Sequence, residues 1–157
     1  MECTYHNIRY PSTTQAAIWQ LKRAQHTGKQ IAEQKQISPA SVSKNLKEAN
    51  TRVLALLKNA AKMNKIHLEV TSARLGFARG YSRVFNVPAY ITYSPVNGVN
   101  VWYHHEGKCE ECDDFTPCRK SLINEFEERN IEVPRDVIRP TFLAEILFKK
   151  IEVIIRK

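Results

Sequence analysis

Residues 28–46 read GKQIAEQKQISPASVSKNL and carry the signals of two helices that meet at a short turn. Thr27 and Ser38 are each suited to cap a helix, because a hydroxyl can accept a hydrogen bond from a free backbone N–H. Pro39 stands at the first helical position, where its missing N–H costs nothing. Ile37 is placed to fill the turn between the helices. The stretch therefore predicts a helix over 29–35 and a second helix that starts at 39.

The helices extend outward from this stretch in both directions. A helix over 15–25 precedes it, and the second helix continues for about 25 residues, or about 38 Å. Its apolar residues recur at spacings of four and three: Val42, Leu46, Ala49, Val53, Leu56, Ala60 and Met63. Such a heptad seam can pack within one chain or against the same helix of a second chain. We predict a homodimer, with core packing inside the monomer as the alternative.

The outward-facing positions around the turn are short or cationic, as a helix that enters a DNA groove requires. The segment IAEQKQISPASVSKNL also resembles the helix-turn-helix of transcription regulators, in the sigma-factor and LuxR-like style of many archaeal one-component regulators. The resemblance covers residues 12–60 and departs at Gln36, where glycine is usual. It implies a regulator that recognises double-stranded DNA through its second turn-flanking helix. The candidate DNA contacts are Lys29, Gln30, Ser38, Ser41, Ser43, Lys44 and Lys47.

The net charge of +8 is confined to the first part of the chain. Residues 1–66 hold eleven Lys or Arg residues and three acidic residues, whereas residues 67–157 hold thirteen of each. This asymmetry is typical of a surface that binds a polyanion, although a solubilising charged face would have the same composition.

Residues 67–157 have a different pattern. Strands are expected near Leu68 and Val70 and over 84–87, 89–93 and 99–103. The turn SPVNG at 94–98 indicates a β-hairpin inside a sheet of three or four strands. Helices are expected over 119–130 and from 141 onward, with a short strand at 153–155 as the alternative.

The predicted fold class is therefore α+β, with two domains. Residues 1–66 would form the helix-turn-helix domain with its long connecting and dimerisation helix. Residues 67–157 would form a small antiparallel sheet with helices, a metal site, and a role in dimerisation and sensing.

A cysteine cluster lies in residues 104–118, which read HHEGKCEECDDFTPC. Cys109 and Cys112 have the C-x2-C spacing that lets two thiolates reach one ion, and Cys118 follows. His104 or His105 could complete a Cys3His set. The prediction is one structural Zn2+ ion.

Two other interpretations of the cluster stay open. One is a sensing site, either an iron–sulfur cluster or a zinc site whose thiolates oxidise, and the other is a set of ordinary free cysteines. Five nearby acidic residues would raise the thiol pKa values unless a cation neutralises them, which favours a metal. Cys3 and His6 form a C-x2-H pair that could add or replace a ligand.

The sequence lacks the usual signs of several other classes. It has no P-loop, no zinc-protease motif and no convincing nucleophile–base arrangement, so we expect no enzyme. No apolar run approaches the ~18–20 residues of a membrane span. The first residues lack a signal-peptide profile, so we expect a cytoplasmic protein without a membrane partner.

The remaining expectations concern function and individual side chains. The alternatives to a DNA-binding regulator are an RNA-binding or translation-associated factor and a metal- or redox-sensing adaptor that docks through the long helix. No small-molecule effector is identified, although Tyr81, Tyr90, Tyr93 and Tyr103 could line a pocket as well as an ordinary packed sheet. The acidic run of Glu125, Glu127, Glu128 and Glu132 is interpreted as a solvated helix face.

Overall fold

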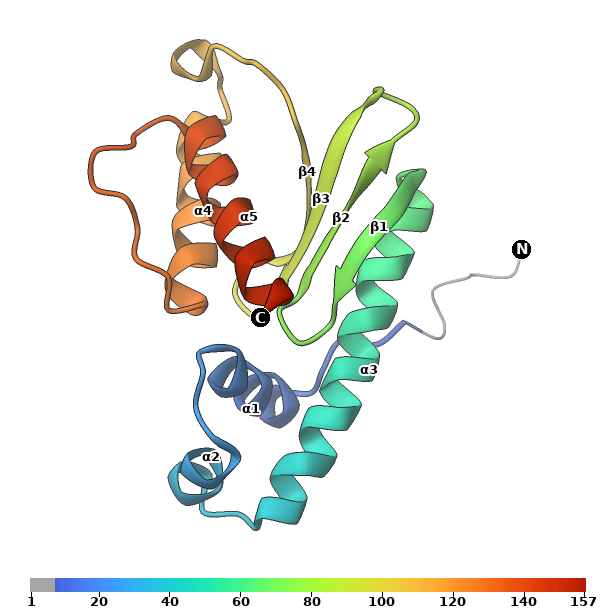
Figure 1. The fold of residues 1–157 in the computed structure, drawn as a ribbon, viewed down its shortest axis with the longest axis vertical. Coiled ribbons are helices and arrows are strands. Elements are labelled where there is room, and N and C mark those ends of the chain that lie inside the picture. Colours follow the sequence, from blue (N-terminus) through green and yellow to red (C-terminus); the bar gives the residue numbers. More distant parts are fainter. Residues whose placement is uncertain (1–7) are drawn as a thin grey trace.

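The computed structural model describes residues 8–157 and has an α+β fold, as predicted. Three helices come first, four antiparallel strands follow, and two helices come last (Figure 1). The helices are α1 (Thr13–Arg23), α2 (Gly28–Lys35), α3 (Pro39–Met63), α4 (Phe115–Glu128) and α5 (Pro140–Arg156), with a short 3-10 helix η2 (Cys109–Glu111). The strands are β1 (Ile66–Ser72), β2 (Phe77–Ser82), β3 (Val87–Ser94) and β4 (Gly98–Tyr103). Of the helices described, none has the length and apolar character that a membrane crossing needs.

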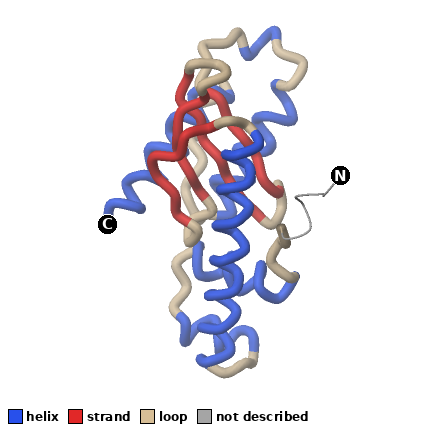
Figure 2. Tube along the Cα trace, turned by 90° about the vertical axis from the view of Figure 1, so that its right-hand side faces the viewer, coloured by secondary structure: helices blue, strands red, loops and turns tan. Residues whose placement is uncertain are grey.

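The sheet is a meander with the strand order β1-β2-β3-β4 and lies between two helical layers. The C-terminal part of α3 covers one face of the sheet, and α4 with α5 covers the other (Figures 1 and 2). The alternation of β3 explains this arrangement, because Ile91 faces α3 whereas Tyr90 faces α5. The sheet is therefore covered by helices on both faces, although one face of the edge strand β1 is exposed.

Several elements differ from the sequence expectations, and β2 lies at Phe77–Ser82, where no strand was expected. Residues 84–87 were expected to form a strand, but 83–86 form the turn between β2 and β3, and Asn86 has a left-handed backbone with φ 55°. The helix expected at 119 begins at Phe115. The tail at 153–155 belongs to α5 and forms no strand.

The apolar seam of α3 is used within the chain. Its first part packs with Ile18 of α1 and Ile31 of α2, and its later part packs on the sheet through Val53 and Leu57. Met63, at the end of the seam, is 54% exposed. The seam is thus occupied by the chain's own core, and the homodimer stays a prediction.

Helix α1, which precedes the α2–α3 turn, is tied to α4 by buried charges. Arg23 of α1 forms an ion pair of 2.7 Å with Glu128 of α4, and it also donates to the Tyr93 carbonyl at 3.0 Å. Its guanidinium carbon lies 4.5 Å from the centre of the Trp19 ring. Burial, and then the positive charge of Arg129, lower the pKa of Arg23 to about 10, although the nearby glutamates oppose this shift.

A second buried pair lies one turn earlier on the same helix. Arg129 pairs with Glu125 and donates to the carbonyls of Leu75 and Gly76, and Glu125 also accepts from Asn97 at 2.9 Å. The expectation of a solvated acidic face is therefore wrong for Glu125, whose side chain is fully buried.

The same expectation fails for Glu128, which has the buried Arg23 as its partner. It holds for Glu127, which is exposed on α4, whereas Glu132 is exposed but lies in the loop after this helix. Glutamates can be buried here because arginines meet them, Arg129 from the end of the same helix and Arg23 from α1.

Candidate nucleic-acid interface and cysteine-lined cavity

The helices on either side of the α2–α3 turn have capped ends. Thr27 and Gln30 exchange side-chain to backbone hydrogen bonds at the start of α2. Gln36 ends α2 in the left-handed region, with φ 54° and ψ 45°. Glycine often adopts this conformation at the C-terminal end of a helix. The Ser38 hydroxyl then accepts from the Ser41 N–H at 3.1 Å. The departure from glycine at Gln36 therefore leaves the turn geometry intact.

The candidate DNA contacts divide into two groups. Gln30 and Ser38 are exposed, but their side chains already cap α2 and α3, and Ser41 is half-buried. The other four are exposed and project from α2 and α3: Lys29, Ser43, Lys44 and Lys47. The surface available to a partner is therefore smaller and more cationic than expected.

The exposed cations of α3 form one stripe along the whole helix. Lys44 and Lys62 are eighteen residues apart, which is five turns, and Lys47 and Lys58 are eleven apart, which is close to three. All four are exposed and lie opposite the buried face. Lys58 and Lys62 were counted in the charge asymmetry but not as contacts, and the 3.6-residue period would have placed them on this stripe.

The stripe carries little negative charge. Glu48, the single acidic residue of α3, accepts a hydrogen bond of 2.5 Å from Gln15 of α1. Arg52 donates to the Tyr10 carbonyl at 3.1 Å. Polar groups beside the stripe are thus used to hold α3 to its neighbours, whereas the lysines extend into solvent.

The cysteine loop connects β4 to α4 at the opposite end of the molecule from α2 (Figure 1). Arg139, at the start of α5, pairs with Glu110 at 2.7 Å, and the Cys109 thiol donates to the Thr141 hydroxyl at 3.6 Å. These two contacts fasten the loop to α5.

The three cysteines of the loop are free thiols and line one cavity, but they differ in exposure. Cys109 is buried, Cys118 is half-buried and Cys112 is exposed. Burial, and then the two other thiols and Asp114, raise the pKa of Cys118. The expected effect of a nearby acidic residue is present, but burial is the larger cause.

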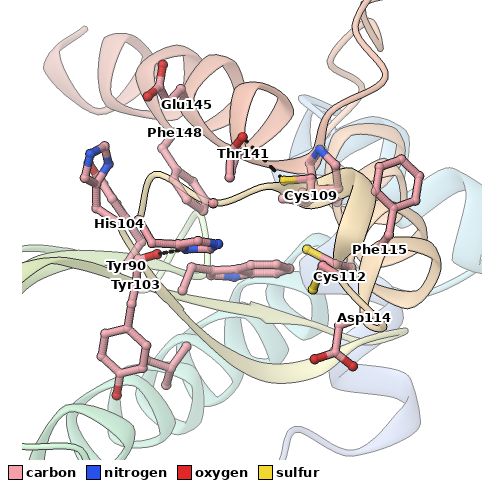
Figure 3. Close-up of a pocket in the computed structure, with 18 of the residues that line it drawn as sticks. Tyr90, Tyr103, His104, Cys109, Cys112, Asp114, Phe115, Thr141, Glu145 and Phe148 are labelled. Carbon is pink, nitrogen blue, oxygen red and sulfur yellow. Dashed lines mark hydrogen bonds between the residues drawn. The ribbon is translucent and has the colours of Figure 1, made fainter. Parts of the chain in front are cut away.

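The predicted zinc ligands are not assembled into a site. Among residues 8–157, no three His, Cys, Asp or Glu side chains form a group that could hold a metal ion. His104 lies across the cavity from Cys112 (Figure 3), and His105 donates from Nδ1 to the Tyr103 carbonyl at 2.9 Å. Cys3 and His6 lie outside the described residues. A Cys3His site would therefore require the loop to rearrange.

The cavity beside the thiols has a volume of about 530 Å3 and is partly open to solvent. Its walls come from β3, β4, the cysteine loop, α4 and α5. Aromatic residues from several of these elements contribute to the lining: Tyr90, Trp102, Tyr103, Phe115 and Phe148. Of the four tyrosines considered from the sequence, Tyr90 and Tyr103 line this cavity, whereas Tyr93 packs on the opposite face of the sheet and Tyr81 is exposed.

Comparison with known proteins adds no family to this description. No protein-family model, curated protein or solved structure matches the chain significantly. The functional argument therefore rests on the residues and their geometry.

Proposed function

We propose that this protein is a DNA-binding transcription regulator that contacts duplex DNA through α2 and α3. The observation that carries the proposal is the exposed lysine stripe on α3, which begins at a helix-turn-helix. The α2–α3 turn lies at a free end of the molecule (Figure 1), so no other described segment would block its approach to a duplex. A helix of this kind fits the major groove when its outer residues are small or cationic.

The individual side chains would make different kinds of contact with DNA. Lys29, Lys44 and Lys47 would neutralise phosphates, which supplies affinity but no sequence information. Ser43 is exposed beside Lys44 and is short enough to let the helix approach base edges. As a homodimer, the protein would bind two half-sites about one helical turn apart.

The test is a fluorescence-anisotropy titration of labelled duplex DNA over a range of salt concentrations. The variant Lys44→Ala/Lys47→Ala should bind more weakly, and its salt slope should fall by about two phosphate contacts. The matched control is Lys149→Ala/Lys150→Ala, which removes the same charge from exposed positions of α5. Equal slopes for both double variants would contradict the docking geometry.

An RNA-binding role is the second candidate, since the lysine stripe would attract any nucleic acid. A structured RNA hairpin titrated at the same salt concentration separates the two roles. Tighter binding to the hairpin than to any duplex would replace the regulator proposal with an RNA-binding one. An adaptor protein would show no salt-dependent binding to either.

We also propose that the cysteine loop binds one zinc ion after rearranging. The support is chemical: three thiols with a C-x2-C pair line one cavity, and a cation would offset the charge of the surrounding acids. Metal analysis and a visible spectrum of anaerobically purified protein test this. One zinc per chain and no colour is the expected result, whereas iron with a brown colour would indicate an iron–sulfur cluster. Protein without metal would leave three ordinary cysteines.

A further inference from the structure

The cavity beside the cysteine loop has the size and lining of a small-molecule site. Ligand sites in proteins commonly measure about 300–1,000 Å3 and are mostly apolar with a few polar groups. This cavity, at about 530 Å3, falls within that range. An apolar cavity of roughly 150 Å3 already admits benzene, so this larger cavity has room for two fused rings.

The shape of the lining favours a flat ligand. The rings of Tyr90 and Phe148 are stacked, with centroids 4.3 Å apart and planes 19° from parallel. Trp102 lies at a larger angle to Phe148, 59° at 6.3 Å. A planar ligand ring can stack on the outer face of this pair and contact the edge of another aromatic ring at the same time. A puckered ring cannot do both.

Most polar side chains of the lining are exposed, so few polar groups remain for a ligand in the interior; the exposed ones are His104, His105, Lys108, Asp114 and Glu145. The Trp102 indole N–H already donates to the Thr92 hydroxyl at 2.9 Å, so it is not available. Thr141 accepts from the Cys109 thiol and therefore keeps its own hydroxyl proton for another acceptor (Figure 3). One hydrogen-bonding substituent on the ligand would suit this arrangement.

The cavity is also held open. The wall that carries the cysteines is fastened to α5 by the Arg139–Glu110 pair and the Cys109–Thr141 contact. The facing wall belongs to the sheet, which is fixed by its hydrogen-bonded neighbours. Apolar side chains consequently face an open space, and a ligand would remove this surface from water.

We propose that this cavity binds a planar aromatic molecule of one or two fused rings that carries one small hydrogen-bonding substituent. The binding site is formed by Tyr90, Trp102, Phe115, Thr141, Ala144 and Phe148. The proposal does not depend on DNA binding, and it concerns the cavity as it stands here, before any rearrangement of the cysteine loop around a metal.

The test uses 2-naphthol and its saturated counterpart decahydro-2-naphthol as probes, added to the 15N-labelled full chain. The chain has two tryptophans, so its spectrum holds two indole N–H signals that report on separate places. Trp102 lines the cavity, whereas Trp19 is packed against α3 on the other face of the sheet. We expect 2-naphthol to shift the Trp102 signal saturably, leave the Trp19 signal unmoved, and bind roughly tenfold more tightly than the saturated alcohol.

Two variants complete the experiment. Ala144→Phe should fill the cavity and weaken 2-naphthol roughly tenfold, whereas Lys149→Ala on the exposed side of the same helix should bind as the natural protein does. If Ala144→Phe fails to fold, the two indole signals of the natural chain still decide the question. The proposal is overturned if Trp102 shows no saturable shift, if both signals shift together, or if the two probes bind equally.

Discussion

Arg23 of α1 and Glu128 of α4 form an ion pair of 2.7 Å although they are 105 residues apart in the chain. The Arg23 side chain is fully buried and that of Glu128 is 12% exposed, so the pair is screened little by solvent. α4 begins in the cysteine loop and ends at this pair. The helix therefore connects the wall of the aromatic cavity directly to the helix-turn-helix.

Removing the carboxylate of this pair should destabilise the whole protein. In Glu128→Gln, Arg23 keeps its buried charge but loses its ionised partner, a change that typically costs about 3 kcal/mol. Urea unfolding monitored by circular dichroism measures the loss. The control is Glu127→Gln, an exposed neighbour on the same helix, which should change the free energy of unfolding by less than about 0.5 kcal/mol. Similar midpoints for both variants would show that the pair contributes little.

A methyl group at Gly76 should be poorly tolerated. Gly76 has φ +57°, and an added Cβ would lie 2.5 Å from the Tyr93 carbonyl oxygen and 2.8 Å from the Trp19 ring. Gly76→Ala should therefore lose about 2 kcal/mol or more, because backbone strain adds to the overlap. Gly28→Ala is the matched substitution, since Gly28 has no heavy atom within 4 Å of the added carbon. Thermal melting should show a large drop only for the first variant.

The end of α2 should gain stability from the glycine that the turn usually contains. Gln36 adopts the left-handed region at φ 54°. Gln36→Gly should relieve a strain of about 1 kcal/mol, partly offset by the greater freedom of the unfolded chain. Gln34→Gly, inside the same helix, should instead cost about 1 kcal/mol. Opposite shifts in the melting temperature are the expected result, and a loss of stability in both variants would contradict it.

The three loop thiols should react in the order of their exposure. Iodoacetamide should modify Cys112 first, Cys118 more slowly and Cys109 last, because Cys109 is only 6% exposed. Mass spectrometry of the digested protein follows each site separately. If the proposed zinc site forms, stoichiometric zinc should slow all three reactions together. Protection of Cys112 alone would point to a surface metal contact without a three-thiol site.

Local patterns predicted much of the fold. The heptad spacing from Val42 onward predicted a helix of about 25 residues, and α3 has 25. The turn at 94–98 and its flanking aromatics predicted the β3–β4 hairpin. Both features depend on residues close in sequence, where periodicity and turn chemistry act directly. The same kind of local pattern gave the wrong strand at 84–87. Its apolar residues suggested a strand, whereas Asn86 turns the chain.

The parts that could not be predicted depend on distant partners. Glu125 and Glu128 have the sequence pattern of an exposed helix face, and only the fold brings Arg23 and Asn97 against them, whereas Arg129 is one helical turn from Glu125. The candidate sites were likewise predictable only where they depend on residues close in sequence. The lysines of α3 could be placed from spacing alone, but the aromatic cavity required the pairing of β3 with β4 and the packing of α5 on the sheet.

The continuous helix α3 has one further consequence for the protein. Its first half belongs to the helix-turn-helix and its second half to the central sheet, and Trp19 of α1 lies in the same apolar cluster as Ile91 of β3. A chain cut at residue 66 would expose the apolar face that α3 presents to the sheet. The part that we propose to bind nucleic acid is thus not an independent unit that could be exchanged between proteins. It would have to be expressed and folded together with the sheet against which α3 packs.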